Sequence, residues 1–79
     1  MIMSLKIIRA ILAERMGYSD DTEITSNLSL FDDLEMNGND FDETIAELEE
    51  RFDIEFDDDD IDGIEYVSDL VKFVKKHAE

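Results

Sequence analysis

The strongest helix signal in the chain comes from the stretch NGNDFDETIAELEERF, residues 37–52. Its large apolar side chains recur at intervals of four, three and four residues: Phe41, Ile45, Leu48 and Phe52. This spacing is typical of one buried face of an α-helix. Asn37 or Asn39 is suited to cap the first turn, and the acidic residues that follow complement the positive end of the helix dipole. We therefore predict a helix from Gly38 or Asn39 to Arg51, with an acidic outer face.

Two further helices are predicted on either side of this one, over residues 5–16 and 66–77. Ser4 is suited to cap the first, and Gly17 can end it in a left-handed conformation. Both segments repeat apolar residues at helical spacing, at Leu5, Ile7, Ile8, Ile11 and Leu12 in the first and at Val67, Leu70, Val71 and Val74 in the last. Each segment is therefore expected to turn one apolar face toward a common core.

The remaining segments predict a long connection and a short helix. Residues 18–35 show no sustained period and alternate polar turn formers with isolated apolar residues, which indicates a loop held to the core by those side chains. A short helix is expected over residues 58–62, with aspartates at its favourable N-terminal end. Few residues favour strands. We predict one all-α domain over residues 1–79, a small four-helix bundle with a long loop between helices one and two and a short third helix.

The charge of the chain is extreme and unevenly placed. Its formal net charge is −16, and residues 17–71 contain 21 acidic residues and one base, Arg51, for a local net charge of −20. Nucleic acid is excluded as a partner because its phosphates would be repelled. The basic surface of a partner enzyme is expected instead, because a clustered field orients encounter. The alternative interpretation is that the charge serves solubility alone.

Composition narrows the remaining classes of protein. Without cysteine the chain has neither disulfides nor thiolate metal sites, which suits a cytoplasmic location. The N-terminus is interpreted as the start of a helix and not as a signal peptide, and no segment approaches the roughly 20 apolar residues of a membrane span. No nucleophile with a nearby base is evident, and His77 lies near a helix end, so no catalytic residue and no enzymatic activity are predicted. A monomer is expected.

Three segments resemble the acyl carrier protein family. Glu23-Ile24-Thr25 resembles the family's Glu-Val-Thr, residues 29–34 resemble the run of serine, apolar and acidic residues before its attachment motif, and residues 48–56 resemble the segment that ends its second helix. The resemblance extends without gaps from about Glu23 onward. It implies a non-enzymatic carrier whose 4'-phosphopantetheine arm is attached to a serine by a transferase that uses coenzyme A. The family carries acyl, polyketide or amino-acyl chains and docks through its acidic second helix.

The attachment motif itself departs from the family. In the register of the resemblance, Asp-Ser-Leu becomes Asn37-Gly38-Asn39, and no serine occurs between Ser29 and Ser68. Glycine has no hydroxyl, so no arm is expected on Gly38. The partner-docking residues that the resemblance implies are Asn37, Asn39, Asp40, Glu43, Glu47, Glu49 and Glu50. A docking or scaffold role in fatty-acid, polyketide or related biosynthesis is therefore predicted. The alternative is a genuine carrier whose native attachment serine is substituted in this chain.

A third hypothesis is an acidic protein that binds divalent cations. The candidate ligands are Asp57, Asp58, Asp59 and Asp60, where crowded carboxylates attract calcium or magnesium loosely. The pattern from Asp58 to Gly63 also matches the opening of an EF-hand loop. It fails further on, because the eighth position is Glu65 where an apolar residue is required and the twelfth is Asp69 where a glutamate is required. The alternative to a cation site is an ordinary acidic helix start that is exposed to solvent.

Overall fold

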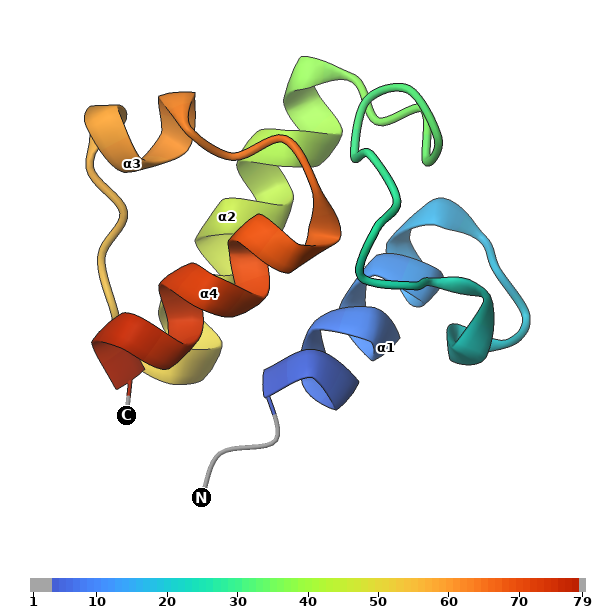
Figure 1. The fold of residues 1–79 in the computed structure, drawn as a ribbon, viewed down its shortest axis with the longest axis horizontal. Coiled ribbons are helices and arrows are strands. Elements are labelled where there is room, and N and C mark those ends of the chain that lie inside the picture. The colour runs from blue at the N-terminus through green and yellow to red at the C-terminus, as the bar shows by residue number, and fades with distance from the viewer. Residues whose placement is uncertain (1–3, 79) are drawn as a thin grey trace.

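The computed structural model describes residues 4–78, and four α-helices and one 3₁₀ helix account for most of that range (Figure 1). The elements are α1 (Ser4–Met16), η1 (Asp21–Glu23), α2 (Gly38–Phe52), α3 (Asp58–Asp62) and α4 (Val67–Ala78). Between residues 4 and 78 the β-structure consists of an isolated antiparallel bridge between Ser29 and Tyr66. The predicted all-α fold, with its long first loop and short third helix, is confirmed.

Helix α2 begins where its sequence predicts, because a complete capping box closes its first turn. The side chain of Asn37 accepts from the amide of Asp40 at 2.7 Å, and the carboxylate of Asp40 accepts from the amide of Asn37 at 3.2 Å. This exchange satisfies two amides that the helix itself leaves unpaired. The helix ends at Phe52, one residue later than predicted, where Asp53 turns left-handed with φ 55°.

Helix α1 shows that one predicted cap was wrong. Ser4 is the first residue of the helix and not the residue that precedes it. Its side chain is buried, and its Oγ has no hydrogen-bond partner among the described residues. A residue with helical backbone is not in the flanking position from which a side chain caps a helix. The prediction at the other end is confirmed, since Gly17 has φ 80° directly after Met16.

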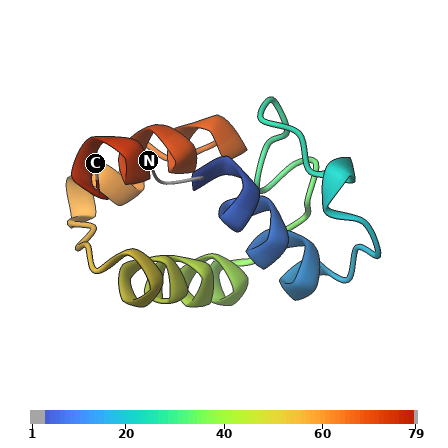
Figure 2. The ribbon, with the colours of Figure 1, turned by 90° about the horizontal axis from the view of Figure 1, so that it is seen from below.

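The core lies between α1, α2 and α4. Figure 2 shows α2 and α4 on opposite sides of the molecule, with α1 inclined between them. Fully buried side chains come from each of the three helices and from the long loop: Ile8, Leu12, Ile24, Leu30, Leu48, Val67, Leu70 and Val74. Three helices and one loop thus bury apolar surface together, which is the main stabilising contribution in a domain of this size.

Backbone pairing fixes the long loop against the start of α4. Leu30 donates its amide to the carbonyl of Glu65 at 2.9 Å, and Val67 and Ser68 donate theirs to Leu28 and Ser26 at 3.0 and 2.9 Å. These bonds bring two segments far apart in sequence into contact. They explain how a loop without regular structure keeps its shape, because buried or half-buried amides need partners.

Helix α4 begins at Val67, one residue later than predicted, and it buries a residue that the apolar pattern missed. Phe73 is buried, while the predicted inward residue Val71 is half-buried. The ring of Phe73 stacks on Phe56 at a centroid distance of 3.9 Å and an angle of 17°. The inward face of α4 is therefore wider than the predicted stripe, because the segment between α2 and α3 brings Phe56 to its flank.

Candidate functional site

The first residue of α2, Gly38, lies in an open position. A Cβ atom added to its backbone would meet nothing within 4 Å, and its φ is not in the left-handed region. Gly38 is exposed and directly follows the capping residue Asn37. The backbone at this position therefore accommodates a side chain without strain, and glycine is not required there for conformation.

Apolar contacts anchor the segment that leads into α2. Leu34 and Met36 are buried on either side of Glu35, which has a left-handed φ of 58°. Phe31 is 42% exposed, and its ring lies 5.3 Å from the ring of Phe41 in the first turn of the helix. The start of α2 is thus held rigidly, and an exposed aromatic side chain lies beside it.

One edge of the acidic face of α2 is paired with α1. The guanidinium of Arg15 donates through one terminal nitrogen to Glu43 at 2.7 Å and through the other to Glu47 at 2.8 Å. Arg51 lies 3.6 Å from the second oxygen of Glu47. The side chains of Arg15, Glu43 and Glu47 are 24%, 54% and 35% exposed. Partly exposed ion pairs of this kind contribute about 0.2–1 kcal/mol each.

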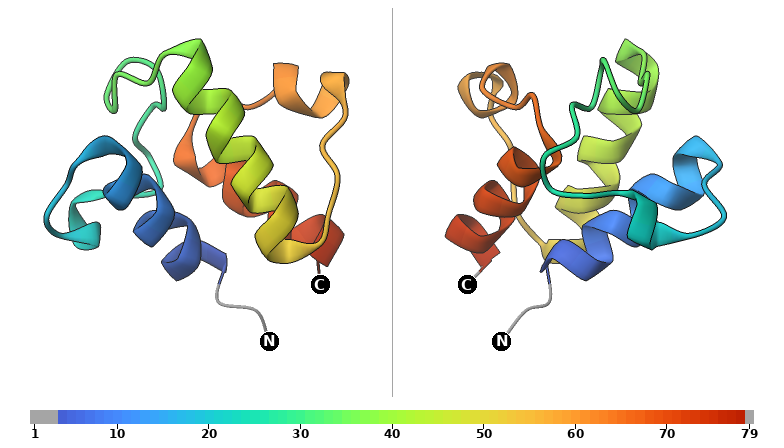
Figure 3. Two further views of the ribbon diagram at one scale, coloured as in Figure 1. Left: turned by 180° about the vertical axis from the view of Figure 1, so that it is seen from behind. Right: turned by 45° about the vertical axis from the view of Figure 1, so that its right-hand side comes forward.

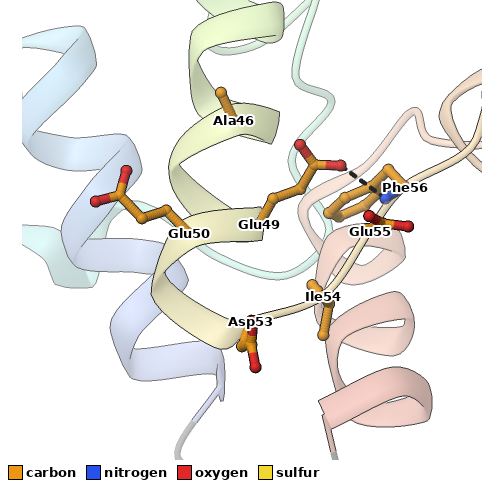
Figure 4. Close-up of a pocket in the computed structure, with 7 residues that line it drawn as sticks. All are labelled: Ala46, Glu49, Glu50, Asp53, Ile54, Glu55 and Phe56. Atoms are coloured by element: carbon orange, nitrogen blue, oxygen red, sulfur yellow. Dashed lines mark hydrogen bonds between the residues drawn. The ribbon is translucent and has the colours of Figure 1, made fainter.

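The other edge of α2 faces the segment that leads to α3. Glu49 accepts from the backbone amide of Phe56 at 2.8 Å, so this carboxylate positions that segment (Figure 4). A hollow of about 590 Å³ lies here, lined by Ala46, Glu49, Glu50, Asp53, Ile54, Glu55 and Phe56. Glu50 is exposed, and no described residue pairs with its carboxylate. This edge therefore presents free negative charge beside a few apolar side chains.

All the residues predicted for partner docking lie on α2 or on its cap, but their surroundings differ. Asp40 takes part in the capping box, and the side chain of Asn39 donates weakly to Glu43 at 3.4 Å. Glu43 and Glu47 are paired with Arg15. No sequence pattern predicts this pairing, because it joins residues 28 and 32 positions apart. Glu50 is the member of the set with the freest carboxylate.

The four aspartates at residues 57–60 do not converge into a metal site. Asp57 accepts from the amide of Asp60 at 3.0 Å, and the carboxylate of Asp60 accepts from the amide of Asp57 at 3.3 Å. The amide of Asp60 is also the chief reason that the pKa of Asp57 is lowered. Within residues 4–78, no group of three or more His, Cys, Asp and Glu side chains is arranged to hold a metal ion. The predicted cation site is therefore unsupported, because two of its carboxylates cap α3.

Comparisons with known proteins agree with this fold. The family model described as "Phosphopantetheine attachment site" matches residues 6–74. The acyl carrier protein of Clostridium acetobutylicum is 38% identical over 77 residues, which cover 98% of this chain and 99% of that protein. Those of Brachyspira hyodysenteriae and Rubrobacter xylanophilus are 34% and 38% identical over 91% and 92% of this chain, and over 92% and 89% of their own lengths.

The small helical fold and these matches define a carrier domain of the phosphopantetheine-binding class. The chain belongs to the acyl carrier protein family. Members of this family are non-catalytic, so the prediction that the chain is not an enzyme is confirmed. In the part of the chain that the structure describes, no helix is both long enough and apolar enough to cross a bilayer.

Proposed function

We propose that this protein is a carrier-like docking module that lacks the phosphopantetheine arm and engages a basic surface of a biosynthetic enzyme through α2. The observation that supports the proposal is Gly38 at the first position of α2, in the register where the family's Asp-Ser-Leu reads Asn37-Gly38-Asn39. The arm requires a hydroxyl oxygen for its phosphodiester. Glycine offers no side chain, and both neighbours carry amides.

The neighbouring hydroxyl groups are poor substitutes for the missing serine. Ser29 is buried, and its Oγ accepts from the amide of Asp32 at 3.1 Å. Thr44 is 1% exposed, and its hydroxyl donates to the carbonyl of Asp40 at 2.8 Å inside the helix. Neither hydroxyl is presented to an approaching transferase. The residues present around the start of α2 therefore do not fit the family's prosthetic group.

The acidic face of α2 is retained although the hydroxyl is absent, which favours a role in docking. Glu43 and Glu50 are exposed and Glu47 is half-buried, and a clustered negative field attracts and orients a basic partner. The partner class is an enzyme of fatty-acid, polyketide or related biosynthesis that recognises acyl carrier proteins. This protein would occupy the enzyme's carrier site as a scaffold or competitor.

A second candidate function is that of a genuine carrier whose native residue at position 38 is serine. It is favoured by the open space around Gly38, where a side chain meets no neighbouring atom within 4 Å. The two candidates differ in covalent mass. The protein isolated from its native host has the mass of the bare chain if the first proposal is correct. A mass greater by the glycine-to-serine difference plus one phosphopantetheine group would support the carrier function instead.

Docking is tested with an enzyme of fatty-acid biosynthesis from the same host that recognises acyl carrier proteins, immobilised for a binding measurement at low salt. We expect Glu50→Lys to weaken binding about tenfold or more, because it places a cation at the centre of the acidic face. Glu65→Lys is the matched control, since Glu65 is exposed and lies outside α2. Equal losses in the two variants would mean that only net charge matters and would contradict docking through α2.

A further inference from the structure

We propose that Arg15 of α1 is an internal competitor for the acidic face of α2, which a basic partner has to displace in order to dock. The inference rests on the docking function proposed above and adds a device that regulates it. Figure 3 shows α1 running beside α2, and the ion pairs of Arg15 connect the two helices. Two carboxylates of the acidic face are therefore occupied from within the molecule before any partner arrives.

The geometry of the contact imitates the recognition that a partner would use. Glu43 and Glu47 lie one helical turn apart, and each receives one terminal nitrogen of the same guanidinium, at 2.7 and 2.8 Å. A planar guanidinium is well suited to bridge two carboxylates in this way. An arginine on a partner enzyme would seek the negative charge of the same two carboxylates, so Arg15 competes with it for them.

The contact is weak enough to be displaced. All three side chains are partly exposed, and solvent screens such pairs. The Nε of Arg15 is buried and has no hydrogen-bond partner among the described residues, so the guanidinium is incompletely satisfied in this position. Release of Arg15 into water would restore hydration to that nitrogen. A partner's cation can therefore replace Arg15 at Glu43 and Glu47. The free energy needed to displace Arg15 lowers the affinity of docking.

The other basic residues near α1 do not perform this role. The Nε of Arg9 donates to the carbonyl of Ile24 at 2.6 Å, so Arg9 holds the loop before α2. Lys6 is exposed on α1 and has no ion-pair partner among the described residues. Lys6 therefore provides a matched control, because its neutralisation changes the net charge by the same amount without releasing Glu43 and Glu47.

The test is a calorimetric titration of the same fatty-acid biosynthetic enzyme with the full chain at low salt. We expect Arg15→Gln to tighten binding roughly three- to tenfold, because two carboxylates become free. Lys6→Gln is expected to tighten it by less than about twofold. Thermal unfolding of each variant by circular dichroism shows whether it remains folded. Equal changes in the two variants, or weaker binding by Arg15→Gln, would overturn the inference.

A double-mutant cycle gives an independent test. Glu47→Gln should weaken docking more in the Arg15→Gln background than in the original chain, because only there has Glu47 lost its ion pair with Arg15. Equal losses in both backgrounds would exclude competition by Arg15. If Glu50→Lys weakens binding while Arg15→Gln behaves like Lys6→Gln, the docking function stands and this inference fails. If no variant binds the biosynthetic enzyme, both fail.

Discussion

Two glycines of this chain serve different purposes. Gly17 has φ 80° and ends α1, a backbone conformation that residues with a Cβ atom adopt only at a cost. Gly38 begins α2 with open space around it and no left-handed φ. The first glycine is needed for conformation, whereas the second affects only which chemical group the site presents.

This difference predicts opposite effects of alanine at the two positions. Gly17→Ala should lower the free energy of unfolding by about 1–2 kcal/mol, because it places a Cβ atom in a left-handed turn. Gly38→Ala should leave it unchanged or raise it by up to about 1 kcal/mol, since alanine restricts the unfolded chain and fits the helix. Urea unfolding monitored by circular dichroism measures both values. A loss at Gly38 as large as that at Gly17 would contradict this assignment.

At the scale of the element, the features that depend on neighbouring residues along the chain, helix bounds and helix caps, were predictable. The start of α2, the bounds of α3 and a capping asparagine at residue 37 or 39 follow from periodicity and from the chemistry of capping residues, which act within one or two turns. The burial of Phe73 and the pairing of Arg15 were not predictable. Both depend on residues outside the helix concerned, Phe56 in the segment before α3 in one case and Glu43 of α2 in the other, and the period of one helix contains no information about its neighbours.

The same limit applies to the site. The sequence indicated which side chains occupy the outer face of α2, because helical spacing determines the face. It did not indicate that Glu49 accepts from the amide of Phe56 or that Glu47 pairs with Arg15, since these contacts arise only when α2 packs. The predicted cation site was unsupported for a related reason, because local backbone amides near α3 compete for the same carboxylates.

The capping box of α2 leads to a prediction with a close control. Asn37→Ala should lower the free energy of unfolding by about 1 kcal/mol, because the amide of Asp40 loses its acceptor. Asn39 is exposed, and its side chain makes only the weak 3.4 Å contact with Glu43, so Asn39→Ala should change stability by no more than about 0.5 kcal/mol. Thermal or urea unfolding distinguishes the two, and comparable losses would show that the cap contributes little.

Helix α3 is expected to loosen in acid at its N-terminal cap. The pKa of Asp57 is lowered in the folded state, first by the hydrogen bond from the amide of Asp60. A carboxyl group with a lowered folded pKa contributes stability above its unfolded pKa of about 3.9, and that contribution is lost as the pH falls through the folded value. Acid also weakens the repulsion within this highly negative molecule, so the two effects oppose each other.

Hydrogen exchange at single amides separates the loss of the Asp57 cap from the relief of charge repulsion. The amide of Asp60 should exchange with solvent faster, relative to amides of α2, as the pH falls below about 4, after correction for intrinsic exchange. Asp57→Asn keeps an acceptor at the cap but removes its titration, so the relative protection of Asp60 should then be independent of pH in this range. A pH dependence that survives in the Asn variant would assign the change to another group.

At the scale of the whole molecule, charge repulsion acts across the full width of the fold. The molecule measures 28 × 27 × 20 Å and has a formal net charge of −16. At 10 mM salt the screening length is about 30 Å, so every carboxylate interacts with every other one. At 1 M salt it is about 3 Å, and only direct neighbours interact. The melting temperature should therefore rise as salt increases between these limits.

A single neutralisation separates this global repulsion from local effects. Glu55 is exposed and makes no ion pair among the described residues, so Glu55→Gln removes repulsion without breaking a contact. We expect the variant to melt roughly 2–4 °C higher at 10 mM salt, and the gain should disappear at 1 M salt. Glu47→Gln is the counterpart, because Glu47 pairs with Arg15 and its loss removes an attraction together with the repulsion. Equal gains for Glu55→Gln at both salt concentrations would mean that local preference, and not the net charge, limits the stability of this fold.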